Sequence, residues 1–169
     1  MSIEAVARAT LRYFPPEVAI VMVAIAGAES GYRLDARGDP LSIFDPWTQV
    51  RIRPYSCGGY TSFGPYQIHL PAHYPRLREL TGSSDPCVWA AWLFDPDNSA
   101  RMAREIYNVQ GFGAWTAYNT GAYIPFQDEA AYVVFALAGA GREPPTLAVE
   151  PPPIPVSPEA LPPIAPPGA

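Results

Sequence analysis

The chain has 169 residues, of which 22 are Pro, and a formal net charge of −5. Its apolar fraction of 49% suffices for the core of one domain and excludes a coiled coil, a collagen and a wholly disordered chain. The acidic balance argues against nucleic-acid binding, which usually relies on a basic surface patch.

The first thirty residues predict two helices. The first runs from about Ser2 to Leu11, with Ser2 as its N-cap. Proline at the start and glycine after the end delimit the second, at about Glu17–Ser30, with Gly31 as its C-cap. Because this second helix is apolar almost all round, we expect it to be buried in the middle of the domain.

The longest apolar run, Val18–Ala28, has eleven residues. A membrane-spanning helix needs about 20, so we predict no membrane span. The run resembles a secretory signal in having Arg8 and Arg12 upstream and small residues at 26–28, but residues 15–17 (Pro-Pro-Glu) interrupt the approach to it. We therefore interpret it as a core helix and expect no signal peptide.

The rest of the domain's sequence predicts a mainly helical fold that is interrupted by one long irregular insertion. Residues 32–63 are rich in Asp, Pro, Gly, Arg and Ser, which indicates a surface excursion with a small hairpin around Thr48–Tyr60. Further helices are expected at His73–Leu80, Pro86–Phe94, Ser99–Val109 (capped by Asp97 or Asn98), Trp115–Asn119 and Phe126–Ala138.

The C-terminal segment has a different composition. Eleven of the 26 residues from Pro144 onward are Pro, which favours an extended polyproline-type tail or linker. We therefore divide the chain into a domain at 1–143 and a tail at 144–169. A disordered end is the simpler interpretation of this tail, and a docking strand for another protein is the alternative.

The sequence leaves the state of the two cysteines open. Cys57 and Cys87 could form a disulfide that closes a loop of about thirty residues, or they could be two free buried thiols. His69 and His73 lie four residues apart, as two metal ligands on a helix would. However, Pro71 lies between them and no acidic third ligand is evident, so we predict neither a metal site nor a cofactor.

Glu29 is the leading candidate for acid–base chemistry. It lies at the end of the predicted apolar helix, where partial desolvation and the negative end of the helix dipole both raise the pKa of a carboxyl group. A carboxyl that keeps its proton near neutral pH can act as a general acid. The alternative is a glutamate whose side chain simply extends into water.

Four segments, in order, resemble the motifs of lytic transglycosylases with a lysozyme-like fold. Residues 29–36 (Glu-Ser-Gly-Tyr-Arg-Leu-Asp-Ala) are similar to Glu-Ser-Gly-Phe-x-Pro-x-Ala, and 64–68 (Gly-Pro-Tyr-Gln-Ile) to Gly-Leu-Met-Gln. Residues 94–100 are similar to Asp-Pro-x-x-Asn-Ile, and 115–121 to Ala-Tyr-Asn-Ala-Gly. The resemblance covers about residues 17–135. It departs from the pattern at Leu34 and Tyr66, and in the insertion that precedes Gly64.

The resemblance implies cleavage of the β-1,4 bond between N-acetylmuramic acid and N-acetylglucosamine in peptidoglycan, giving 1,6-anhydro ends. It implies that Glu29 is the single catalytic acid and base and that Ser30 orients it. It also implies that Gln67 and Tyr66 line the substrate groove, that Tyr118 contacts Glu29 or the sugar, and that Asn119 fixes that loop.

Three alternatives remain. Asp35, Asp39 or Asp45 could position a water molecule and give the hydrolytic outcome of a goose-type lysozyme. The fold could instead bind cell wall without cutting it, as a module of a phage virion, or it could cleave chitin. The expected partners are peptidoglycan glycan strands and, through the tail, phage tail or virion proteins. We expect action at the cell wall or periplasm, after release by lysis or from a virion.

Overall fold

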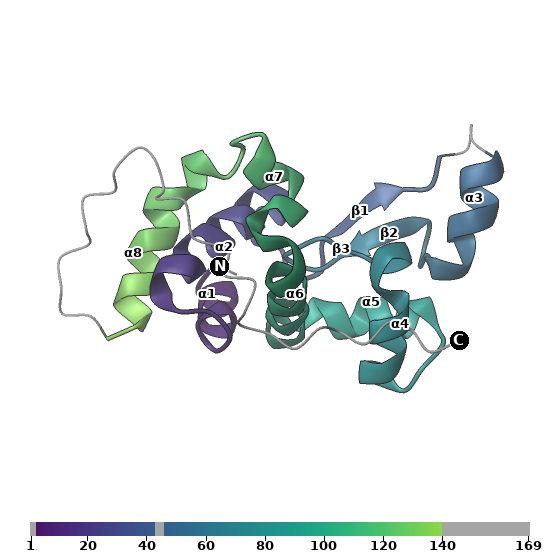
Figure 1. The fold of residues 1–169 in the computed structure, drawn as a ribbon, viewed down its shortest axis with the longest axis horizontal. Helices are drawn as coiled ribbons and strands as arrows, with labels where there is room; N and C mark the ends of the chain where they lie inside the picture. The colour runs from purple at the N-terminus through teal and green to yellow at the C-terminus, as the bar shows by residue number, and fades with distance from the viewer. Residues whose placement is uncertain (1–2, 43–45, 140–169) are drawn as a thin grey trace.

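The protein is mainly helical, with one small sheet (Figure 1). The computed structural model describes residues 3–42 and 46–139. The helices are α1 (Ile3–Leu11), α2 (Pro16–Ser30), α3 (Pro46–Ile52), α4 (Leu70–Thr81), α5 (Pro86–Phe94), α6 (Pro96–Gln110), α7 (Thr116–Asn119) and α8 (Gln127–Leu137). Expectations for Ser2, Asp45 and the tail at 144–169 lie outside the described residues.

Helix α2 is the centre of the core. Every residue from 18 to 27 is buried, because the helix is apolar on all sides and packs against α1 and α8 (Figure 1). It ends at Gly31, whose left-handed φ of 60° lets its N–H donate to the Gly27 carbonyl at 2.8 Å. The predicted second helix and its glycine cap are confirmed.

Two later helices begin earlier than predicted, and each has a proline in its first turn. Pro71 lies in the first turn of α4, where no backbone N–H is needed, so it does not interrupt the helix as we expected. In α6 the first position is Pro96, and the N-cap is therefore Asp95 rather than Asp97 or Asn98. The Asp95 carboxylate accepts from the N–H groups of both of those residues, at 2.8 and 3.2 Å.

The predicted hairpin around Thr48–Tyr60 is confirmed only at its C-terminal end, where Cys57 and Tyr60 form an isolated antiparallel bridge. That segment holds α3 and a 3₁₀ turn (Arg53–Tyr55), and the strands flank it. The antiparallel sheet has the order β1 (Arg37–Pro40), β2 (Tyr60–Phe63) and β3 (Ile68–His69). β1 pairs with β2 across the α3 segment, and Thr61, Ser62 and Phe63 of β2 are buried. β2 also packs against α4 and α5.

Of the two states that the sequence left open for the cysteines, the structure has the disulfide. Cys57 precedes β2 and Cys87 lies in the first turn of α5, with 5.0 Å between their Cα atoms. The bond ties the insertion to α5, which lies beside β2. The disulfide therefore holds the start of β2 against α5.

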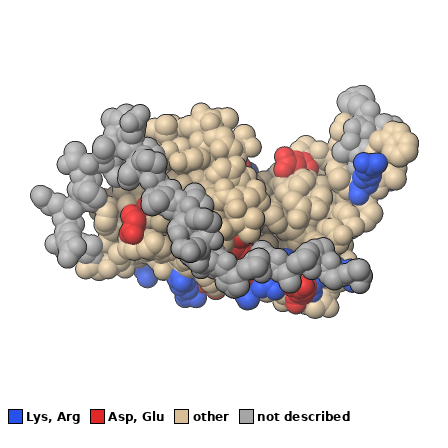
Figure 2. All heavy atoms as spheres, viewed as in Figure 1, with Lys and Arg blue, Asp and Glu red and all other residues tan. Residues whose placement is uncertain are grey.

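The face of the molecule shown in Figure 2 carries few charged side chains, and most of its basic ones lie along the lower edge, with another at the upper right. The basic side chains are all Arg, since the chain has no Lys. Among the described residues, none of the helices combines the length and the apolar composition that crossing a membrane requires.

Candidate active site

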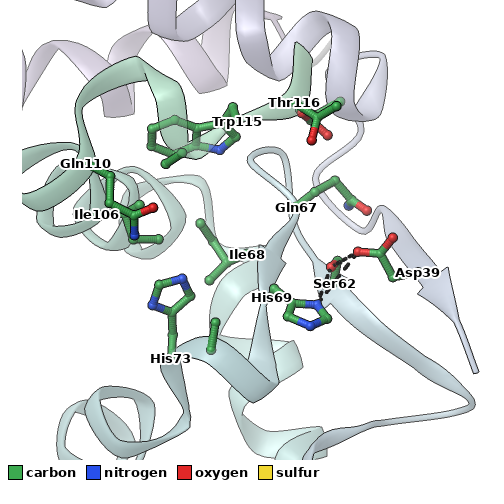
Figure 3. A pocket seen from close by; sticks show the side chains of 13 residues that line it. Asp39, Ser62, Gln67, Ile68, His69, His73, Ile106, Gln110, Trp115 and Thr116 are labelled. Atoms are coloured by element: carbon green, nitrogen blue, oxygen red, sulfur yellow. Dashed lines mark hydrogen bonds and ion pairs between the residues drawn. The ribbon is translucent and has the colours of Figure 1, made fainter. Parts of the chain in front are cut away.

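A cavity of about 610 Å³ lies where the small sheet meets the helices (Figure 3). Eight polar residues line it, and six of them lie on α2, the sheet and α4: Glu29, Asp39, Ser62, Gln67, His69 and His73. They come from α2, all three strands, the β2–β3 turn and α4. Segments that lie far apart in the sequence thus contribute to one polar cavity.

Glu29, the next-to-last residue of α2, lies half-buried in this cavity. Burial raises the pKa of its carboxyl group, and the nearby Asp39 charge raises it further. The N–H of Ala117, which donates to Glu29 Oε1 at 3.3 Å, opposes this rise but does not cancel it. The predicted direction is confirmed, and Glu29 holds its proton to a higher pH than an exposed glutamate does.

The loop that supplies the Ala117 N–H is fixed by its own hydrogen bonds. Trp115 Nε1 donates to the Tyr66 carbonyl at 3.1 Å, and Asn119 Nδ2 donates to the Gly113 carbonyl at 2.9 Å. Asn119 therefore fixes this loop, but its side chain is exposed and lies outside the cavity lining. Its role is to hold the loop that contacts Glu29.

Two residues predicted to contact substrate lie outside the cavity lining. Tyr66 is fully buried and its hydroxyl is hydrogen-bonded to the Thr10 hydroxyl at 2.6 Å, so it belongs to the core. Tyr118 stacks between Phe112 and Tyr123, with ring centroids 5.0 Å apart on each side, and does not line the cavity. In both cases an aromatic ring gains more by burial among other rings than by lining a wet cavity.

Ser30 does not orient Glu29. Its hydroxyl donates to the Ala26 carbonyl at 2.8 Å, one turn earlier in α2, and the side chain is buried. A serine at the end of a helix commonly satisfies its own backbone in this way. We therefore assign Ser30 to the helix end.

Gln67 lines the cavity, as predicted. Its Nε2 donates to the Gly64 carbonyl at 2.9 Å, while its Oε1 lies against Gly38, at a place that a Cβ on Gly38 would occupy. The residue adopts a left-handed φ of 49°, which is uncommon outside glycine. The β2–β3 turn and the glycine in β1 together hold this amide at the cavity wall.

Of the two aspartates of the trio that the structure describes, Asp35 and Asp39, Asp39 lines the cavity. Its carboxylate accepts a hydrogen bond from Ser62, and Ser62 Oγ lies 3.1 Å from His69 Nδ1 (Figure 3). His69 Nδ1 is 3.7 Å from Asp39 Oδ2. Asp35 is exposed and lies outside the cavity lining.

The remaining wall of the cavity is mostly apolar. It consists of Ile68, Ala72, Ile106, Gln110, Ala114, Trp115 and Thr116. Trp115 lies on this wall and is only 6% exposed. Burial lowers the pKa of His73, which favours a neutral imidazole on this side.

Sequence reasoning missed Ser62, Gln110 and Thr116 as cavity residues. For Ser62 the signal was its place two residues before the 64–68 motif. Thr116 lies within the 115–121 motif, although its own side chain was not singled out. Gln110 carried no such signal, because its position in the cavity follows from where the end of α6 lies in space.

Comparisons with protein-family models, with curated proteins and with solved structures give no match. The chemistry of the site therefore follows from its own residues. A carboxyl group whose pKa is raised by burial and a second carboxyl group line one cavity, together with amide and imidazole groups. Such a pair is suited to general acid–base cleavage of a glycosidic bond. The described residues hold no cluster of three His, Cys, Asp or Glu side chains arranged for a metal ion.

Proposed function

We propose that the chain is a lytic transglycosylase with a lysozyme-like fold, which cuts peptidoglycan between N-acetylmuramic acid and N-acetylglucosamine. One observation carries the proposal: Glu29 lies half-buried in a cavity of about 610 Å³, and burial raises the pKa of its carboxyl group. The motifs at 29–36, 64–68, 94–100 and 115–121 supply the choice of substrate.

In the proposed reaction Glu29 acts first as an acid and then as a base. Its carboxyl proton passes to the glycosidic oxygen as the C1–O bond breaks, which leaves a carboxylate. The carboxylate then takes the proton of the muramoyl 6-hydroxyl as that oxygen bonds to C1. The product is a 1,6-anhydro sugar, no water is consumed, and Glu29 regains its proton.

The surroundings of Glu29 support this cycle. The Ala117 N–H donates to Oε1, and a donor in that place stabilises the carboxylate formed halfway through the reaction. Gln67 offers an amide for an acetamido or hydroxyl group of the glycan. The apolar side of the cavity, with Ile68, Ile106 and Trp115, suits the less polar face of a sugar ring.

A hydrolytic outcome is the second candidate, and the position of Asp39 favours it. Asp39 lines the same cavity as Glu29, and a second carboxylate on the opposite side of the bond could deprotonate an attacking water. The water oxygen would bond to C1, Asp39 would take its proton, and Glu29 would protonate the leaving oxygen. The product would then carry a reducing muramic end.

The first test is whether the activity depends on Glu29. We expect Glu29→Gln to abolish the release of soluble muropeptides from purified peptidoglycan, since an amide cannot donate the required proton. Glu17→Gln is the matched control, because Glu17 is an exposed glutamate in the first turn of the same helix. Cleavage by Glu29→Gln at the wild-type rate would refute the proposed function.

The second test separates the two outcomes by their products. Mass spectrometry of the muropeptides should show 1,6-anhydro ends, which are lighter by one water than reducing ends. Products that carry only reducing ends would assign the hydrolytic reaction. Retention of the protein on peptidoglycan without any cleavage would instead favour a cell-wall-binding module, and cleavage of chitin oligomers in place of peptidoglycan would favour the chitin-directed alternative.

The expected place of action and partners follow from this proposal. The substrate lies in the cell wall, so the protein would act there or in the periplasm, on glycan strands. Contact with phage tail or virion proteins through residues 144–169 remains a prediction from the proline content of that segment.

A further inference from the structure

Asp39, Ser62 and His69 form a hydrogen-bonded chain across all three strands of the sheet. Ser62 lies in the central strand, directly opposite Gly38 of β1 and His69 of β3. Residues directly opposite each other in antiparallel strands point to the same face, so Ser62 and His69 meet there. Asp39 has a left-handed φ of 52°, and its carboxylate reaches the Ser62 hydroxyl from the neighbouring position.

The direction of the hydrogen bonds follows from the number of protons available. An ionised carboxylate can only accept, so Ser62 must give its single hydroxyl proton to Asp39. Ser62 Oγ is then an acceptor for His69 Nδ1, 3.1 Å away, which requires that Nδ1 carry a hydrogen. His69 therefore fixes the hydroxyl of Ser62, and Ser62 in turn fixes the carboxylate of Asp39.

The Asp39 side chain needs this support because it is 68% exposed, whereas Ser62 is only 1% exposed. An exposed aspartate without a partner samples several rotamers, and holding one of them costs conformational entropy. Here a buried hydroxyl and an imidazole select one arrangement in advance. A second anchor comes from Thr61, whose hydroxyl donates to the Asp39 carbonyl at 3.1 Å.

We propose that Ser62 and His69 are positioning residues that hold the Asp39 carboxylate towards the sugar whose C1–O bond breaks. Positive charge develops at C1 as the leaving oxygen departs, and a preorganised carboxylate stabilises it. This inference rests on the proposed function, because it requires that Glu29 initiates a cleavage in this cavity. It applies to both outcomes, since the charge at C1 develops whether water or the 6-hydroxyl attacks.

A double-mutant cycle on peptidoglycan cleavage tests the proposal. We expect Asp39→Asn to lower kcat by about 10–100-fold and Ser62→Ala to lower it by about 3–10-fold. In the Asp39→Asn background, Ser62→Ala should change kcat by less than about twofold, because Ser62 acts through the carboxylate. Equal effects of Ser62→Ala in both backgrounds would overturn the proposal.

His69 gives an independent version of the same test. His69→Leu removes the donor to Ser62, and it should lower kcat by about 3–10-fold with little change in KM. His69→Asn places an amide N–H near the former Nδ1 and should restore most of that loss. If Ser62→Ala does not fold, this pair carries the test, since the His69 side chain is 43% exposed and tolerates replacement better. Equal losses in both His69 variants would contradict a positioning role.

Glu29→Gln and Ser56→Ala in the same assay keep the two proposals apart. The Ser56 hydroxyl bonds to the Arg53 carbonyl in the insertion, away from the cavity, and its loss should leave kcat unchanged. If Glu29→Gln is inactive while the cycle is additive, only the positioning role fails. If Glu29→Gln cleaves like the wild type, or if the wild type does not cleave, the proposed function and the positioning role both fail.

Discussion

At the scale of single residues, the site depends on two carboxyl groups that share one cavity but differ in exposure. Glu29 is half-buried, and the pKa of its carboxyl group is raised first by that burial and then by the charge of Asp39. Glu29 acts in its protonated form, so activity should fall as the pH rises through its pKa in the folded protein. Neutralising Asp39 removes one of the two causes of the raised pKa.

We therefore expect Asp39→Asn to move the alkaline limb of the pH–rate profile to lower pH. Ser62→Ala keeps the charge of Asp39 and should leave that limb in place while lowering the maximum. Initial rates of peptidoglycan cleavage between pH 4 and pH 9, at constant ionic strength, measure both effects. An alkaline limb that stays in place in Asp39→Asn would mean that Asp39 does not influence the proton on Glu29.

The same carboxyl group makes stability depend on pH. Because the pKa of Glu29 is raised in the folded state, its contribution to stability is present at low pH and is lost as the pH rises through that value. The amide of Glu29→Gln does not ionise. We expect the Tm of Glu29→Gln to exceed that of the wild type by more at pH 8 than at pH 4, as measured by calorimetry, with Glu17→Gln as the control. A difference in Tm that does not vary with pH would contradict the raised pKa.

At the scale of elements, the β2–β3 turn depends on one glycine. Gly64 has a φ of 79°, and the Leu93 carbonyl at the end of α5 lies where a Cβ on Gly64 would stand. The N–H of Gly64 also donates to the Ala36 carbonyl at 2.9 Å, just before β1. The turn that places Gln67 and His69 is therefore held between α5 and the start of the sheet.

Gly64→Ala should lower the free energy of unfolding by about 2–4 kcal/mol, because left-handed strain adds to a clash with backbone. Gly59→Ala is the matched control: Gly59 has a φ of 82°, but nothing lies within 4 Å of the added Cβ. It should cost only about 1 kcal/mol. Urea unfolding of both variants measures the difference, and equal losses would show that the contact with Leu93 contributes nothing.

At the scale of the whole molecule, the disulfide joins the insertion to the helical body. The link between Cys57 and Cys87 closes a loop over a sequence separation of 30, and the chain-entropy relation gives about 3–4 kcal/mol for a loop of that length. Double replacement by Ser should lower the Tm by about 6–16 °C. Reduction of the wild type with a phosphine should lower it by a similar amount, and a Tm unchanged by both would refute a stabilising role.

Removal of residues 144–169 should leave the Tm of the domain nearly unchanged. Their composition offers too little apolar periodicity to add to the core. Calorimetry of the full chain and of the chain ending at 143 makes the comparison. A loss of many degrees would mean that this segment packs on the domain.

The sequence by itself determined the elements whose signals are local. Helix α2 and its end at Gly31 follow from a continuous apolar run bounded by proline and glycine. The direction of the pKa shift of Glu29 was predicted from its place at the end of that run, whereas the Asp39 charge that adds to the shift comes from β1. The helix boundaries at α4 and α6 were displaced because a proline in the first turn starts a helix as well as it ends one.

Only the tertiary structure decided which residues meet. β1 pairs with β2 although residues 41–59 separate the two strands in the sequence. The residues between two strands carry no signature of pairing at such a separation. For the same reason the sequence did not separate Tyr66, buried in the core, from Gln67, which faces the cavity one position later. Burial and hydrogen bonding across distant segments decide where each side chain lies, and neither can be obtained from a local pattern.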